Sequence, residues 1–261
     1  HNSAMKAEHI AIAGGGIGGL SAALLLARSG VHVSVLEQAA EFAEVGAGIQ
    51  LGPNAMKLLS AWGLRDAVLS QACLPEAIAV RDAVSGRSIT RMLLGRAVAQ
   101  RYGEVYATVQ RSHLHSVLLQ AVAQQANVSL HAGAAVARVQ TQGTEVEVAT
   151  PQRSLHAQAL VGADGLWSRV RQHVLDDGPP TFTGHVAYRT VINASALTPR
   201  ISPQEVAVWW APKLHVVGYP VRAGTLYNLV VLAEGAPMDE GWNITTPTRQ
   251  VQSIVDKDHN D

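Results

Sequence analysis

The chain has 261 residues, which is enough to bury a sizeable core and to form two domains. Its 20 basic and 20 acidic side chains cancel, so no overall field attracts nucleic acid or an anionic membrane, and a small molecule is the expected partner. A single cysteine, Cys73, excludes an internal disulfide and favours a reducing compartment, for which we expect the cytoplasm.

The first forty residues predict a strand, a glycine-rich turn, a helix and a second strand. We expect the strands over residues 9–13 and 31–36, and a helix over residues 17–28 that ends at Gly30. The uncharged stretch 10–27 could also be read as a signal peptide or a membrane span. Five glycines near its centre weaken a spanning helix, and an acidic residue precedes it where a signal peptide has basic residues.

The next part of the chain alternates between loops, helices and strands. The sequence predicts, in order, a glycine-rich loop over 46–52, a helix from Pro53 to Gly63, a hairpin over 77–94, a strand over 105–110, a helix from Ser112 to about Ala126, and a hairpin over 135–149. The hairpin over 77–94 turns at a Ser-Gly pair and is assigned to another sheet. A turn over 162–165 and a helix over 167–174 then precede a break rich in Asp, Gly and Pro.

Beyond residue 181 the chain becomes rich in strands. Runs over 186–194, 205–210, 214–221 and 226–233 are separated by Pro and Gly, as in an antiparallel sheet. These elements predict an α/β fold with two domains. We expect a Rossmann-like nucleotide-binding domain from residues 5–75 and 105–180, with a mainly antiparallel β-sheet domain inserted from residues 76–104 and 181–261.

Gly14, Gly16 and Gly19 have the G-x-G-x-x-G spacing of a dinucleotide-binding turn, between the first strand and the first helix. In such a turn the glycines allow a tight turn, the approach of backbone to a pyrophosphate, and close packing of the helix on the strand. Glu37 ends the second strand, where a carboxylate accepts hydrogen bonds from ribose hydroxyls. The pattern therefore predicts a dinucleotide and leaves FAD and NAD open; the alternative is a flexible glycine loop.

Three further segments resemble the successive flavin motifs of the class A FAD-dependent aromatic hydroxylases. They are residues 44–55 (EVGAGIQLGPNA), 110–114 (QRSHL) and 162–171 (GADGLWSRVR). The resemblance covers nearly the whole chain and is greatest to the branch of salicylate hydroxylase, 3-hydroxybenzoate 6-hydroxylase and 6-hydroxynicotinate 3-monooxygenase. It implies FAD as cofactor, NADH or NADPH as reductant, and hydroxylation of a phenolic or hydroxypyridine carboxylic acid by O₂, with or without loss of the carboxylate.

The same resemblance implies which residues bind the cofactor. They are Gly14, Gly15, Gly16, Ile17 and Gly19 at the pyrophosphate, Glu37 and Gln38 at the adenosine ribose, and Gln50, Arg111 and Asp164 along the rest of FAD. Without the resemblance, Arg111 is a residue beside the start of a helix. Residues 162–165, which include Asp164, are then a plain turn.

Residues 214–220 resemble the substrate-domain strand that carries a histidine and a tyrosine toward the ring substrate. This resemblance makes His215 and Tyr219 the expected catalytic residues. Histidine titrates near neutral pH, which suits a base that removes a phenolic proton. Positions four apart share one face of a strand, but so do ordinary core residues, so a structural histidine is the alternative.

Other polar residues do not form a second site in the sequence. His113 and His115 stand two apart on a predicted helix, so their side chains diverge and no metal site is expected. Ser112 and Ser168 lack the surroundings of a hydrolase nucleophile, and we expect both to cap helices.

The sequence departs from the family at its end. The family's third flavin motif, a Gly-Asp-Ala-type segment that leads into a long helix, is expected after the substrate sheet and is not found there. We therefore expect the chain to lack the C-terminal part of the family fold. Two alternatives follow: another FAD oxidoreductase of the same fold, such as an epoxidase or reductase, and an inactive nucleotide-binding fragment.

Overall fold

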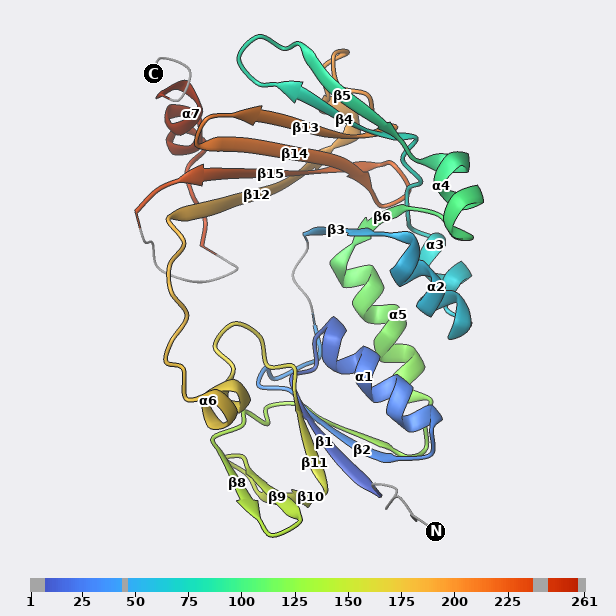
Figure 1. Cartoon of the computed structure of the whole chain (residues 1–261), viewed down its shortest axis with the longest axis vertical. Coiled ribbons are helices and arrows are strands. Elements are labelled where there is room, and N and C mark those ends of the chain that lie inside the picture. The colour runs from blue at the N-terminus through green and yellow to red at the C-terminus, as the bar shows by residue number, and fades with distance from the viewer. Residues whose placement is uncertain (1–7, 44–46, 237–243, 258–261) are drawn as a thin grey trace. The chain divides into compact units, whose positions relative to one another are not determined.

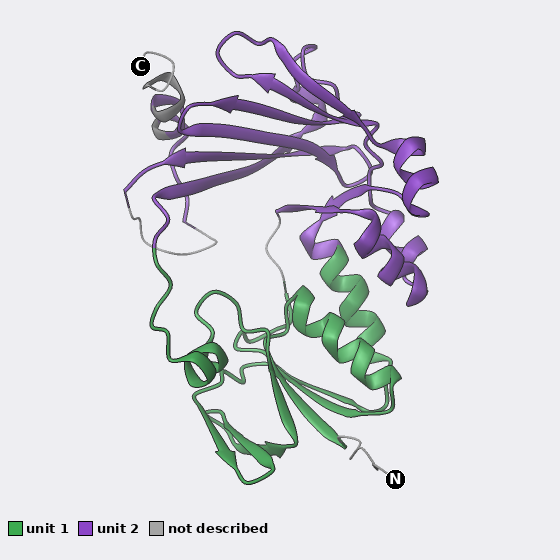
Figure 2. Cartoon of the chain, in the orientation of Figure 1, with its two compact units in different colours: residues 1–44, 114–181 green, residues 45–113, 182–261 purple. Residues whose placement is uncertain are grey.

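The computed structural model describes residues 8–43, 47–236 and 244–257 (Figure 1). The chain forms two compact units, one from residues 1–44 and 114–181 and one from residues 45–113 and 182–261 (Figure 2). No helix within the described ranges is both long enough and apolar enough to cross a membrane.

A parallel sheet of strand order β11-β1-β2-β7 forms the framework of the first unit. Its strands are β1 (His9–Ala13), β2 (His32–Leu36), β7 (Val128–His131) and β11 (Ala159–Gly162). Ala11, Ile12 and Ala13 are fully buried because β1 is a central strand, and central parallel strands are covered on both faces. The Rossmann-like arrangement predicted from the first forty residues is confirmed.

Helix α1 (Ile17–Arg28) packs on β1 and β2, and it buries Leu20 and Leu24. It ends as predicted, with Gly30 at a φ of 82°. Helix α5 (Arg111–Ala123) continues from the second unit into the first. It begins one residue before Ser112, so the prediction that Ser112 caps this helix is wrong: the residue lies within the first turn.

The rest of the first unit consists of a small antiparallel sheet and a short helix. They are β8 (Arg138–Gln142), β9 (Glu145–Ala149), β10 (Ser154–Ala157) and α6 (Arg169–Leu175). The small sheet shares a core with the parallel sheet, in which Val148 packs with Ala11 and Leu36. Ser168 caps α6, as predicted, by accepting a hydrogen bond of 2.9 Å from the backbone N–H of Arg171.

The second unit is built on a six-stranded sheet of order β12-β15-β14-β13-β4-β5. Its strands are β4 (Ala77–Asp82), β5 (Ser88–Leu93), β12 (His185–Asn193), β13 (Glu205–Ala211), β14 (Leu214–Val221) and β15 (Leu226–Glu234). The β4–β13 pair is parallel and the other pairs are antiparallel. This confirms the predicted mainly antiparallel sheet, including the hairpin over 77–94.

Helices and a two-stranded sheet complete the second unit. They are α2 (Pro53–Ala61), α3 (Arg65–Leu69), α4 (Gly95–Tyr102), the 3-10 helix η1 (Ala194–Ala196), α7 (Thr248–Lys257), and the strands β3 (Gly48–Leu51) and β6 (Ala107–Gln110). The predicted loop over 46–52 is therefore a strand from Gly48 onward, because its backbone pairs with β6. Gly46 lies outside the described residues.

Strands β3 and β6 are fastened to one face of the six-stranded sheet. The backbone N–H of Gly48 donates to Oδ1 of Asn228 on β15 at 2.9 Å, and the Thr108 hydroxyl donates to the carbonyl of Pro220 on β14 at 2.5 Å. Residues 47–75 and 105–113 belong to the same compact unit as the large sheet, whereas the sequence assigned them to the nucleotide-binding domain.

Candidate functional site

The glycine-rich turn at the start of α1 is held by backbone hydrogen bonds on both sides. Gly14 N–H donates to the carbonyl of Leu36 at 2.8 Å, and Gly16 is the N-cap of α1 and accepts from Leu20 N–H at 2.9 Å. Gly16 offers no side-chain cap, and the first turn of α1, which begins at Ile17, contains no acidic residue. The first turn of α1 therefore has neither a side-chain cap nor an acidic residue of its own, which fits a bound pyrophosphate.

Three glycines leave no room for a side chain in this turn. A Cβ would lie 2.2 Å from the Ala163 carbonyl oxygen at Gly14, 2.4 Å from the Phe42 ring at Gly15, and 1.9 Å from the Gly14 carbonyl oxygen at Gly19. A Cβ at Gly18 would meet nothing within 4 Å. The close packing expected of a dinucleotide-binding turn is therefore present, and it depends on particular glycines.

Glu37 lies beside the turn at the end of β2. Its Oε2 accepts from Gly15 N–H at 2.7 Å and its Oε1 accepts from Ala39 N–H at 2.8 Å. These bonds orient the carboxylate, and each oxygen keeps a lone pair with which it can accept a ribose hydroxyl. Gln38 is exposed next to it. The turn and Glu37 together fit the adenosine and pyrophosphate parts of FAD.

Asp164 has a clear structural role in the segment between β11 and α6. Its carboxylate accepts from the Ser168 hydroxyl and from the backbone N–H groups of Arg169, at 2.8 Å, and Val170, at 3.3 Å. The side chain therefore caps the N-terminus of α6. A cofactor contact by Asp164 stays a prediction beside this capping role.

A second group of predicted residues lies in the second unit, around β3. The hydroxyl of Tyr106, the residue just before β6, donates a hydrogen bond to Oε1 of Gln50. Tyr219, from β14, is only 5% exposed, and its ring packs so closely on Gly48 that a Cβ there would lie 2.5 Å from it. Gln50, on β3, and Tyr219, which packs on β3 from β14, thus lie near the same strand. Tyr106 also belongs to this group, although the sequence had not singled it out.

Charges and burial set the chemistry of the two tyrosines. Burial raises the pKa of Tyr219 to about 12, although the positive charges of Arg189 and Arg111 act to lower it. Burial, and then the neighbouring Tyr219, raise the pKa of Tyr106 to about 12. Both side chains are therefore neutral phenols at physiological pH. Arg111 also ties the start of α5 to β3, because its backbone N–H donates to the Ala47 carbonyl at 2.8 Å.

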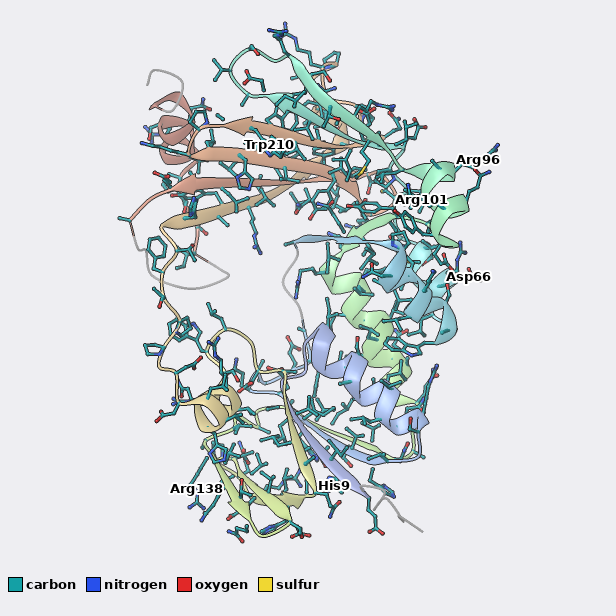
Figure 3. The ribbon with its side chains drawn as sticks, in the orientation of Figure 1. His9, Asp66, Arg96, Arg101, Arg138 and Trp210 are labelled. Atoms are coloured by element: carbon teal, nitrogen blue, oxygen red, sulfur yellow. The ribbon has the colours of Figure 1, made fainter. Side chains whose placement is uncertain are left out.

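His215 shares a face of β14 with Tyr219, two strand repeats away, or roughly 13 Å along the strand. It is half-buried, and its register partners are Trp210 on β13 and Leu232 on β15. Trp210, labelled in Figure 3, is 51% exposed. His215 and Tyr219 therefore occupy two separate points of one sheet face.

Asn228 is a further polar residue on this face that the sequence reading missed. It is fully buried, its Oδ1 accepts from Gly48 N–H at 2.9 Å, and its Nδ2 has no hydrogen-bond partner among the described residues. The signal for it is an amide side chain within the apolar run LYNLVVLA. Tyr106 carries no such local signal, because its role depends on the pairing of β6 with β3.

Within the described ranges, no group of three or more His, Cys, Asp or Glu side chains is placed to hold a metal ion. His113 is half-buried and lies near the carbonyl of Ala67, whereas His115 is buried on a different side of α5. The two histidines therefore diverge, as their spacing predicts.

Known proteins resemble the chain in sequence and in fold. It is 37% identical over 246 residues to a 3-hydroxybenzoate 6-hydroxylase of Polaromonas naphthalenivorans, with 94% of this chain and 61% of the relative covered. It is 35% identical to a 6-hydroxynicotinate 3-monooxygenase of Bordetella bronchiseptica, with 80% and 54% covered. The structure of Klebsiella pneumoniae HpxO complexed with FAD and uric acid superposes with a TM-score of 0.73 at 26% identity, with 89% and 58% covered.

The chain thus spans about three fifths of the length of the first of these relatives. The resemblance to the branch of FAD-dependent ring hydroxylases, inferred from three sequence motifs, is confirmed by these matches. The model of the FAD binding domain family matches residues 7–261, and the chain therefore belongs to this family of FAD-binding proteins.

Proposed function

We propose that the protein is an FAD-dependent monooxygenase that uses NADH or NADPH and O₂ to hydroxylate a small phenolic or hydroxypyridine carboxylic acid. The observation that carries the proposal is one face of the large sheet, where His215 lies on the same strand face as Tyr219, near which Tyr106 is packed. The relatives named above are a hydroxybenzoate hydroxylase and a hydroxynicotinate monooxygenase, which supports a ring acid as substrate. Cys73 is a free thiol, which fits the reducing compartment that we propose.

The residues proposed to hold FAD follow from the geometry of the turn. Gly14 to Gly19 and the start of α1 would bind the pyrophosphate, and Glu37 with Gln38 would bind the ribose. Gln50, Arg111 and Asp164 are proposed for the remaining contacts. FAD, when bound, supplies the transfer of electrons from the nicotinamide and the activation of O₂.

His215 is the proposed general base. Its unprotonated ring nitrogen would take the proton of the substrate hydroxyl, which leaves the ring richer in electrons at the carbon to be hydroxylated. Tyr106 and Tyr219 are poor candidates for this step, because burial raises the pKa of each to about 12 and each remains protonated at neutral pH.

The tyrosines are better suited to positioning the substrate. The neutral phenol of Tyr219 can donate its O–H to a carboxylate or a ring oxygen, whereas Tyr106 donates its own to Gln50 and would position Gln50. Arg189 and Arg111 act electrostatically on Tyr219, so positive charge lies close to it and favours an anionic ring acid. The apolar residues packed around Tyr219 limit the access of water to a bound ring; they include Val191, Val208 and Val217.

The test begins with the absorption spectrum of the purified protein, followed by NADH and NADPH oxidation and O₂ uptake in the presence of hydroxybenzoates and hydroxynicotinates. Ring-acid-stimulated oxidation with a hydroxylated product supports the proposal. Oxidation with no hydroxylated product from any ring acid contradicts it and favours another FAD oxidoreductase. A protein that retains no FAD and oxidises neither nicotinamide contradicts it in favour of an inactive nucleotide-binding fragment.

A further inference from the structure

His115 is a buried histidine that the proposed hydroxylation does not use. It lies on α5, is 2% exposed, and its Nε2 is 2.8 Å from the carbonyl oxygen of Gly15. A carbonyl can only accept, so Nε2 carries the proton and donates it. Helical spacing places His115 with Leu118 and Val122 on the buried side of α5, which is the sequence signal that it faces the interior.

With this hydrogen bond, both backbone polar groups of Gly15 have a side-chain partner. The N–H of Gly15 donates to Glu37 and its C=O accepts from His115, so side chains from two distant parts of the first unit hold both polar groups of one residue. Gly15 is itself buried, so its carbonyl would lose a partner that water could not replace if His115 were removed.

The direction of the Gly15 carbonyl also sets the direction of the next N–H. No cis peptide bond is present among the described residues, and in a trans planar peptide the C=O of Gly15 and the N–H of Gly16 point in opposite directions. When His115 draws the carbonyl toward α5, the N–H of Gly16 points away from α5, at the N-cap of α1. A reversed peptide would turn an oxygen toward a bound pyrophosphate and repel it.

We propose that His115 is a positioning residue of the cofactor site, which holds the Gly15–Gly16 peptide so that its N–H is presented to the pyrophosphate of FAD. His115 acts through the turn and touches no substrate. The proposal rests on FAD binding at the turn and is independent of the ring that is hydroxylated, so its test reads ligand binding instead of turnover.

The experiment compares three variants at His115 with one control. His115→Leu removes the donor, His115→Gln keeps an amide N–H at a reach close to that of Nε2, and His115→Asn keeps the amide but is shorter by one methylene. His113→Leu is the matched control, because His113 lies on the same helix with its Nε2 3.0 Å from the Ala67 carbonyl, away from the turn.

The affinities for FAD, ADP and riboflavin are measured by calorimetry. We expect His115→Leu and His115→Asn to lower the affinities for FAD and for ADP by the same factor, about three- to tenfold, which is the equivalent of one neutral hydrogen bond. Riboflavin, which has no pyrophosphate, should bind the variants as it binds the wild type. His115→Gln and His113→Leu should stay close to wild type with all three ligands.

Hydrogen exchange without ligand gives a second, independent measurement. The amides of residues 14–19 should exchange faster in the His115→Asn protein than in the His115→Gln protein, and the midpoints of denaturation are recorded for both. Equal losses of FAD and riboflavin affinity would overturn the proposal, because they would mark a general loosening of the fold. Unchanged exchange and unchanged ADP affinity in both His115→Leu and His115→Asn would overturn it as well.

Discussion

The two groups of site residues differ in whether backbone or side chains form them. In the first unit the turn is made of backbone, and its tightest contact joins Gly14 and Gly19, which are five residues apart in the sequence. In the second unit the group around β3 uses side chains from distant segments: the Tyr106 hydroxyl bonds to Gln50, 56 residues away, and the Asn228 side chain bonds to the Gly48 N–H, 180 residues away. A backbone site fails when a side chain is added, whereas a side-chain site fails when a functional group is removed.

The largest expected effect is the loss of a functional group in the second unit. A His215→Asn protein should keep FAD and substrate binding but lose hydroxylation rate by roughly 10²–10⁴-fold, the range for the loss of a general base. NADH oxidation stimulated by the ring acid should continue and yield hydrogen peroxide in place of hydroxylated product. Product analysis by chromatography and peroxide assay measure the two outcomes together.

The pH dependence of the same variant is its control. A substrate that loses its phenolic proton without the help of the enzyme becomes more available as pH rises, so the variant should recover partly in alkaline buffer. Tyr219→Phe should not show this recovery. The wild-type Tyr219 has a pKa of about 12 and stays protonated over the assay range, so its removal does not take away a base that alkaline buffer could replace. If His215→Asn couples NADH oxidation to hydroxylation normally and has an unchanged pH profile, His215 is only a structural residue of the sheet.

The next effect is the addition of a methyl group to the backbone site. Gly19→Ala places a Cβ 1.9 Å from the Gly14 carbonyl oxygen, so we expect a loss of FAD binding and a decrease of about 3 kcal/mol in the free energy of unfolding, the upper end of the usual cost of overpacking. Gly18→Ala is the matched control on the same helix: its Cβ meets nothing within 4 Å, and alanine should stabilise the helix by up to about 1 kcal/mol. Equal effects of the two substitutions would contradict the packing argument.

The same contrast explains what the sequence could predict. The turn, α1, β2 and Glu37 are local, so spacing alone placed them, and β14 at Leu214–Val221 was found as a run rich in strand-forming residues between breaks at Pro and Gly. The partners of β3 were not accessible in this way, because pairing register is set by contacts between distant segments. For that reason the sequence read residues 46–52 as a loop and passed over Asn228.

Helix ends show a further limit of sequence reading. Ser112 and Ser168 each stand where a helix was expected to start, yet only Ser168 caps one. At the other helix the strand β6 ends at Gln110 and the helix begins directly at Arg111. No residue is left between strand and helix to act as a separate cap, and this depends on where the pairing of β6 with β3 stops.

A smaller effect is expected at Glu37, whose side chain holds the backbone of the glycine turn in place. Glu37→Ala removes the acceptor for the N–H groups of Gly15 and Ala39 as well as for ribose hydroxyls. FAD affinity should fall by about 1.5–3 kcal/mol, the range for hydrogen bonds to a charged group. Glu37→Gln keeps one acceptor oxygen and should lose less. If FAD affinity per folded molecule is unchanged while the fold weakens, Glu37 is purely structural.

The smallest effect concerns Glu104, which anchors the segment that leads into β6 and Tyr106. Its side chain is 12% exposed and accepts from the Ser60 hydroxyl, the Val105 N–H and Arg65. The Ser60 hydrogen bond is the main cause that lowers the pKa of Glu104. A carboxylate with a lowered folded pKa stabilises the fold fully above its unfolded pKa, about 4.3 for Glu, and this stabilisation is lost as pH falls through the lower folded value.

Glu104→Gln should therefore lower the free energy of unfolding by about 1 kcal/mol at pH 7, where the wild-type side chain is charged. The difference between the two proteins should shrink as the pH falls below about 4, because the wild-type carboxylate then becomes protonated. Urea denaturation at several pH values measures both. Ser60→Ala should give a similar loss at pH 7, since it removes the main hydrogen bond to the carboxylate. A difference in unfolding free energy between wild type and Glu104→Gln that stays constant from pH 7 to pH 3 would show that the packing of this side chain, and not its charge, stabilises the segment. The second unit would then depend on close packing, as the glycine turn does, more than its polar side chains suggest.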